Sequence, residues 1–180
     1  MTIATINTGA TMFIQSIGRQ YYRDGVNLLM QPGSFFEALP SAKTQRDILL
    51  FLGLTALIYS VLATLFTAAN RPMYFVLYSL NALLMPVVTA LVLHLLFRVF
   101  SPGRFRYGLL LGVTAYANGV LLLAWIPGIA PWAELLKYVL IGLGLVKTGG
   151  ISGLKAFSAI VATGAILIMM VYLLQFAMRF

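Results

Sequence analysis

The chain has 180 residues, of which 61% are hydrophobic and 9% charged, and its mean hydropathy is +0.96. This composition excludes an ordinary soluble domain and indicates an integral membrane protein. The net charge of +8 comes from basic residues scattered between apolar runs, which favours membrane orientation over nucleic-acid binding. Because cysteine is absent, disulfides and thiolate metal sites are excluded as well.

The sequence divides into an N-terminal cytoplasmic or interfacial segment, residues 1–43, and a transmembrane domain, residues 44–180. In the first, residues 13–30 predict a weakly amphipathic helix. Its apolar side carries Ile14, Ile17, Tyr21 and Leu28, and its polar side Gln15, Arg19, Gln20 and Arg23. A basic helix ahead of the first span either lies on the membrane surface or forms a solvated N-terminus, and the sequence leaves both readings open.

Two helix starts follow this segment. Ser34 and Glu37 have capping-box spacing, so a short helix is expected through Phe35 and Phe36 to Pro40. Thr44 and Asp47 repeat the pattern, with a carboxylate where the helix dipole favours negative charge, and they mark the start of the first span.

Five apolar segments then predict five membrane spans. About 20 helical residues cover the ~30 Å hydrocarbon core of a bilayer. The predicted spans are residues 48–69, 73–97, 107–126, 132–146 and 157–176, of which the fourth is the shortest. The fold class is therefore an all-α polytopic membrane protein with five transmembrane helices, preceded by a short amphipathic, interfacial helical segment.

Within the first two spans, particular residues suggest how the helices pack. A ridge of small side chains at four-residue spacing in the first span predicts an interhelical contact: Ala56, Ser60, Thr64 and Ala68. Pro86 in the second span removes one backbone hydrogen bond and is expected to kink that helix unless a neighbour compensates.

The distribution of basic residues predicts the orientation. With five spans, nine lysines and arginines fall on the side of the N-terminus and two, Arg71 and Arg179, on the other. The positive-inside rule then places the N-terminus in the cytoplasm and the C-terminus outside. This alternation requires the short fourth span to cross.

Few polar residues lie inside the spans. Tyr116 and Asn118, at the centre of the third, are expected either to bond across helices or to form a small polar site, with Asn81 and Thr89 as candidate partners. His94 is the one histidine, so no histidine-rich metal site is possible, and an interfacial or interhelical hydrogen bond is expected.

The acidic residues have structural interpretations: Asp47 as a helix-start carboxylate and Glu134 as the partner of Lys137. No catalytic, cofactor or metal residues are predicted.

Several stretches resemble the Yip family of Ypt/Rab-interacting integral membrane proteins, in its bacterial branch. They are Pro32-Gly33-Ser34-Phe35-Phe36, Ala115-Tyr116-Ala117-Asn118, Trp125-Ile126-Pro127, Ile141-Gly142-Leu143 and Gly153-Leu154-Lys155-Ala156. The resemblance covers roughly residues 30–176 and implies five spans with a cytoplasmic N-terminus in a bacterial cytoplasmic (inner) membrane. The Asp-Leu-Tyr-Gly-Pro motif of eukaryotic members is absent, so Rab binding is not implied.

We therefore expect a non-enzymatic membrane scaffold or accessory subunit that acts through protein or lipid contacts. Its expected partners are membrane lipids and either another membrane protein or a second copy of the chain, with no nucleic acid and no cofactor. The candidate interface is Phe35, Phe36, Arg19 and Arg23. The alternative is a small transporter or channel-like protein with a polar site near Asn118.

Overall fold

The computed structural model describes residues 3–67, 70–126 and 128–177, with side chains along the first helix described from Gln15 onward. All of its elements are helical. They are α1 (Ile3–Met30), α2 (Pro32–Ala42), α3 (Gln45–Leu65), α4 (Arg71–Phe100), α5 (Tyr107–Ala117), the 3-10 helix η1 (Asn118–Leu123), α6 (Ala130–Gly149) and α7 (Gly153–Ala177). The all-α prediction is confirmed for these residues.

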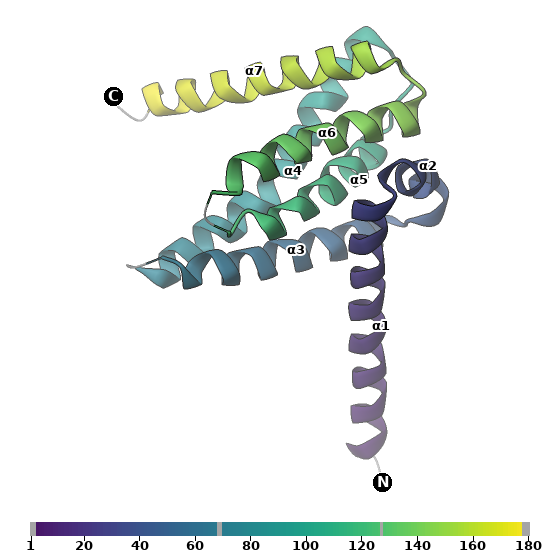
Figure 1. Cartoon of the computed structure of the whole chain (residues 1–180), viewed down its shortest axis with the longest axis vertical. Coiled ribbons are helices and arrows are strands. Elements are labelled where there is room, and N and C mark those ends of the chain that lie inside the picture. The colour runs from purple at the N-terminus through teal and green to yellow at the C-terminus, as the bar shows by residue number, and fades with distance from the viewer. Residues whose placement is uncertain (1–2, 68–69, 127, 178–180) are drawn as a thin grey trace.

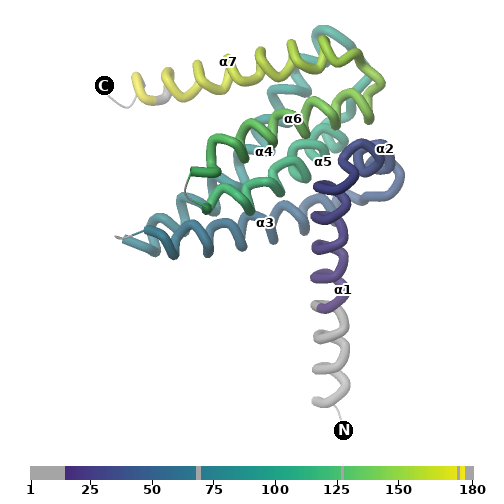
Figure 2. The backbone as a smooth tube through the Cα atoms, viewed as in Figure 1, coloured from purple at the N-terminus to yellow at the C-terminus, as the bar shows by residue number. Residues whose placement is uncertain are grey.

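Helices α3 to α7 run alongside one another, whereas α1 lies across one end of this bundle and α2 covers that end (Figure 1). The tube in Figure 2 likewise shows α1 running across the direction of α3. We call α1 and α2 the N-terminal arm. We call the end that it covers the α2 end.

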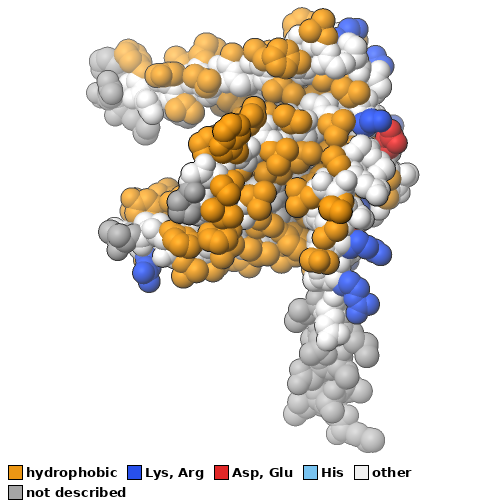
Figure 3. Space-filling view, in the orientation of Figure 1, with side chains coloured by type: hydrophobic (Ala, Val, Ile, Leu, Met, Phe, Trp, Pro, Cys, Tyr) orange, Lys and Arg blue, Asp and Glu red, His pale blue; other side chains and the backbone are white. Residues whose placement is uncertain are grey.

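Three helical stretches are long and apolar enough to cross a membrane: Gln45–Leu65, Arg71–Phe100 and Gly153–Leu173. A shorter apolar stretch, Tyr107–Leu123, corresponds to the predicted third span. The predicted fourth span lies in α6 (Ala130–Gly149), whose 20 residues exceed the predicted segment, but α6 is not among the described helices that are long and apolar enough to cross a membrane, so the five predicted spans are not all confirmed. On the face seen in Figure 3, hydrophobic side chains extend along the bundle, and basic side chains gather at its α2 end.

The third predicted span is not one α-helix. It changes from α-helix to the tighter 3-10 helix at Asn118. At this point Asn118 bonds to a neighbouring helix through its side chain. Phe51 also approaches the backbone closely here, because a Cβ on Gly119 would lie 3.0 Å from its ring. α5 is nevertheless the centre of the bundle, with every residue from Leu110 to Ala117 buried and contacts to α2, α3, α4 and α6.

Glycines allow α5 to approach its neighbours closely. A Cβ on Gly112 would lie 3.1 Å from Cδ1 of Ile48 in α3. A Cβ on Gly144 in α6 would lie 2.5 Å from Cγ1 of Val113, so any larger residue there would force the helices apart. Small residues therefore set the spacing of the central helices, as membrane bundles commonly require.

The predicted ridge on α3 packs inward. Ala56 and Ser60 are buried, Thr64 is half-buried, and Ala68 lies outside the described residues. Ala56 packs with Ala82 of α4 and Leu121 of η1. The ridge is thus an interhelical contact along the part of it that is described.

One predicted helix start is confirmed and the other is corrected. At the start of α3, the Asp47 N–H donates to Thr44 Oγ1 (3.3 Å) and the Thr44 N–H to an Asp47 carboxylate oxygen (3.0 Å). α2, however, begins at Pro32, before the predicted cap at Ser34, whose hydroxyl donates to the Gln31 carbonyl (3.1 Å). Proline is favourable in a first turn because its missing N–H has no helical partner there.

Candidate functional site

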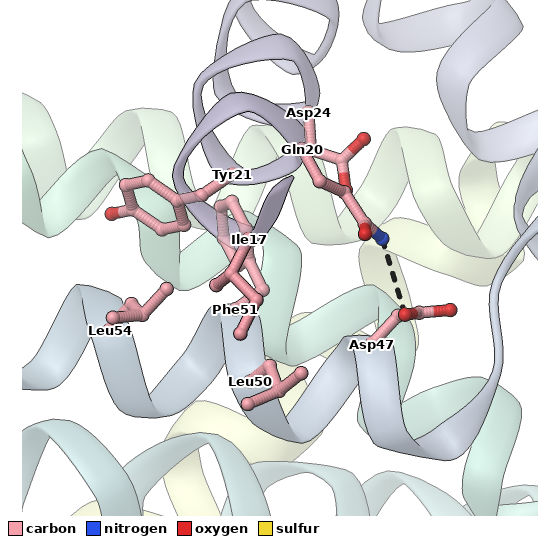
Figure 4. A pocket seen from close by; sticks show the side chains of 8 residues that line it. All are labelled: Ile17, Gln20, Tyr21, Asp24, Asp47, Leu50, Phe51 and Leu54. Carbon is pink, nitrogen blue, oxygen red and sulfur yellow. Dashed lines mark hydrogen bonds between the residues drawn. The ribbon is translucent and has the colours of Figure 1, made fainter. Parts of the chain in front are cut away.

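α1 rests on the bundle through one face of its C-terminal half. Leu28 is buried and Tyr21 is half-buried, in agreement with the apolar side predicted for this helix, and Asp24 is buried on the same side. The side chain of Ile14 lies outside the described residues. In Figure 4, Gln20 and Asp24 of α1 lie above Asp47 at the start of α3. The contact is specific because it joins polar as well as apolar groups.

A buried ion pair fixes the arm. Lys43 Nζ lies 2.6 Å from both carboxylate oxygens of Asp24, and the two side chains are only 13% and 6% exposed, respectively. Lys43 follows α2 and directly precedes α3, so the pair ties α1 to the connection between the arm and the first long apolar helix. A pair this buried is costly to break, since either charge alone would be left without a partner.

An aromatic cluster surrounds the same point. The fully buried ring of Tyr116, from α5, lies 4.9 Å from the Phe35 ring of α2 and 4.5 Å from the Phe51 ring of α3, centroid to centroid. Its hydroxyl donates a long hydrogen bond (3.5 Å) to Asp24. We call Asp24, Lys43, Tyr116, Phe35 and Phe51 the arm junction. It joins α1, α2, α3 and α5 at one place.

Polar contacts continue along α1. The hydroxyls of Tyr21 and Thr55 share a hydrogen bond (3.1 Å), and Gln20 Nε2 donates to Asp47 (3.2 Å). Burial raises the pKa of the Tyr21 phenol, an effect that the bond to Thr55 partly offsets, so this phenol is neutral at physiological pH. The partly open pocket beside these contacts measures about 20 Å³, room for one water molecule and not for an organic substrate.

Asn118 has a defined structural role. Pro86 has no N–H, so the carbonyl of Ala82, four residues earlier in α4, lacks its helical partner. Asn118 Nδ2 donates to that carbonyl (3.1 Å), and Thr114 Oγ1 donates to the carbonyl of Pro86 itself (3.0 Å). Thr114 of α5 and Asn118 of η1 thus compensate for the proline in α4, and the amide of Asn118 is used in this helix packing.

Two other predicted polar residues are placed differently from the expectation. Asn81 is exposed on α4 and does not meet Asn118, because the adjacent Ala82 faces η1 instead. His94 stacks edge-on against Tyr107 with ring centroids 6.0 Å apart. Its Nδ1 is buried with no hydrogen-bond partner among the described residues, so the expected hydrogen bond is not made there.

The residues predicted as an interface divide into two groups. Phe36 is fully buried and Phe35 half-buried, so they hold α2 on the bundle and do not project from it. Arg19 and Arg23 are exposed on α1. α1 also exposes apolar side chains, with Tyr22 73% and Met30 77% accessible.

Asp24 is the residue that sequence reasoning missed. Its position one turn from Tyr21 and Leu28, on the apolar side of the helix, was the available signal. A charged residue on a buried face requires a partner, and Lys43 is that partner.

The predicted structural pairing of Glu134 with Lys137 is confirmed as an ion pair along α6. In the described part of the chain, no three His, Cys, Asp or Glu side chains gather in a metal-binding group. The arm junction offers one carboxylate, one ammonium and one phenol, a set that can hold helices together.

Comparison of the chain with protein-family models, curated proteins and solved structures finds no match. The resemblance to the Yip family therefore stays a prediction from the sequence.

Proposed function

We propose that this protein is a membrane scaffold or accessory subunit of the Yip type that acts through contacts made by its N-terminal arm. The observation that carries the proposal is the buried Asp24–Lys43 pair, which holds α1 across the α2 end. Rigid attachment through one face leaves the opposite face, with Arg19, Tyr22 and Met30, accessible to a partner. The proposed partner is a second membrane protein, a second copy of the chain or the lipid surface.

We further propose five spans, with the arm in the cytoplasm of a bacterium and the C-terminus outside the inner membrane. Helix lengths support this. α6 has 20 residues and is therefore ~30 Å long. α5 has 11 residues and η1 has 6, and together they are ~28 Å long because a 3-10 helix rises ~2 Å per residue. The basic side chains at the α2 end agree with the positive-inside rule (Figure 3). Arg179 lies outside the described residues.

The second candidate is a transporter with a path past Asn118. The change from α-helix to 3-10 helix at Asn118 favours it, since broken helices line the sites of many transporters. Against it, Asn118 is 1% exposed and its amide is bonded to Ala82. The scaffold is therefore the better-supported proposal.

The test is purification of the full chain from native membranes in mild detergent, with mass spectrometry of whatever remains bound. Wild type should retain a stoichiometric partner or a second copy, and Tyr22→Ala should lose it. Tyr172→Ala on α7 is the matched control, because Tyr172 is similarly exposed, at 68% against 73%. Solute flux in liposomes that disappears in Asn118→Leu, with no bound partner, would favour the transporter instead.

A further inference from the structure

A second cavity, distinct from the one at the arm junction, opens beside α5. It has a volume of about 530 Å³ and lies between the α2–α3 connection and the start of α5. Three basic side chains line it, Lys43, Arg104 and Arg106, and its lining includes no acidic residue. We call it the basic cavity.

The charges of its two arginines are not neutralised. Arg104 donates from Nε to the Gly149 carbonyl and from a terminal nitrogen to the Gly150 carbonyl, both at 2.8 Å. These acceptors carry no net charge, and three N–H groups of the guanidinium are left over. The ion pairs of the described residues involve Lys43, Lys137 and Lys147, so neither Arg104 nor Arg106 meets a carboxylate in that part of the chain.

The cavity also has an apolar wall, formed by Leu39, Ile48 and Leu109. α5 begins at Tyr107 with no side-chain cap, so the positive end of its dipole adds to the field of the arginines. Two cationic groups without a carboxylate partner, beside an apolar wall at the end of a helix bundle, match the layout of an anionic phospholipid, in which glycerol esters join a charged phosphate to apolar acyl chains.

We propose that the basic cavity binds the phosphate group of an anionic phospholipid. Arg104 and Arg106 hold the phosphate through charge-assisted hydrogen bonds, and Leu39, Ile48 and Leu109 contact the first carbons of the acyl chains. Arg104 is already oriented by the end of α6, so little ordering is needed on binding. This site is independent of the contact surface on α1.

The experiment is a titration of the full chain in mild detergent, followed by native mass spectrometry. The probes are short-chain phosphatidylglycerol, short-chain phosphatidylcholine and inorganic phosphate. Each basic residue near a membrane surface strengthens the binding of anionic lipid about fivefold, so wild type should prefer phosphatidylglycerol over phosphatidylcholine by roughly 25-fold. Inorganic phosphate, which cannot use the apolar wall, should compete only weakly.

Arg106→Gln should weaken the binding of phosphatidylglycerol about fivefold and leave the binding of phosphatidylcholine unchanged. Arg98→Gln is the matched control: Arg98 is an exposed arginine in the last turn of α4, outside the cavity lining, and its loss should have less than about a twofold effect. If Arg106→Gln does not fold, Arg106→Lys takes its place in the binding comparison, because it keeps the charge but loses the guanidinium fork.

Three outcomes would overturn the proposal. Equal binding of the two lipids would remove the anionic preference. Equal losses of phosphatidylglycerol binding in Arg106→Gln and Arg98→Gln would show that the anionic preference comes from general surface charge and not from the basic cavity. Inorganic phosphate binding as tightly as phosphatidylglycerol would identify a site for free anions and not for lipid.

Discussion

The amide of Asn118 donates to the carbonyl of Ala82, which is the one carbonyl of α4 that Pro86 deprives of its helical N–H. A polar residue near the middle of a membrane bundle invites interpretation as a transport or catalytic site. Here its hydrogen bond supplies the donor that the Ala82 carbonyl lacks within α4. The same relationship explains why α4 continues unbroken from Arg71 to Phe100 although a proline lies inside it.

Asn118→Leu should lower the free energy of unfolding by about 1–2 kcal/mol, because the Ala82 carbonyl is then buried without a donor. In the Pro86→Ala background a backbone N–H is available to that carbonyl, so the same substitution should cost clearly less. Denaturant unfolding in detergent, followed by circular dichroism, measures both. Asn81→Leu, at an exposed position on α4, is the control and should change little. Equal costs in the two backgrounds would refute the compensation of Pro86 by Asn118.

Asp24→Asn should destabilise the protein by about 3–5 kcal/mol, because Lys43 would be left as a buried charge without a counter-ion. Replacing both partners, as Asp24→Leu with Lys43→Met, should recover most of this loss. The control is Glu37→Gln, which removes the exposed pair with Lys147 and should cost less than about 1 kcal/mol. Similar costs for Asp24→Asn and Glu37→Gln would mean that the arm junction is open to water.

Tyr116 contributes mainly through its ring. Tyr116→Phe removes only a 3.5 Å hydrogen bond and should change the free energy of unfolding by less than about 1 kcal/mol. Tyr116→Ala removes the ring from between Phe35 and Phe51 and should cost about 3–5 kcal/mol. The same unfolding assay compares them. A large effect of Tyr116→Phe would instead make the hydroxyl contact with Asp24 the main contribution.

The five-span proposal can be tested by thiol labelling, because the native chain has no cysteine. If α5 and α6 both cross, Ile129→Cys, between η1 and α6, should react with a membrane-impermeant maleimide added from outside the cell. Arg23→Cys on α1 should be protected until the membrane is opened. Reaction of both positions from the same side would show that α5 and α6 return without crossing.

The sequence was informative where a local rule operates. Hydropathy identified the apolar helices, the Thr44–Asp47 spacing predicted the start of α3, and small residues at four-residue spacing marked the packed face at Ala56 and Ser60. Each of these depends on neighbours along one helix. None requires knowledge of which helices touch.

The arm junction could not be predicted in the same way. Asp24 and Lys43 are 19 residues apart and Asp24 and Tyr116 are 92 apart, so their meeting depends on how α1 lies across α3 and α5. The likewise non-local partner of Asn118 turned out to be a backbone carbonyl, which no side-chain pattern could reveal. The shift from α-helix to 3-10 helix at Asn118 was missed for a similar reason.

The docking of the arm on the bundle is the central claim, and one measurement in native membranes tests it most directly. Lys147 Nζ lies 2.6 Å from a Glu37 carboxylate oxygen, so a carbodiimide should join them in an amide bond between α6 and α2. Peptide mapping should find that link in wild type and not in Glu37→Gln, with the Glu134–Lys137 pair within α6 as the positive control. Finding the α6 link without the Glu37–Lys147 link would contradict a docked arm.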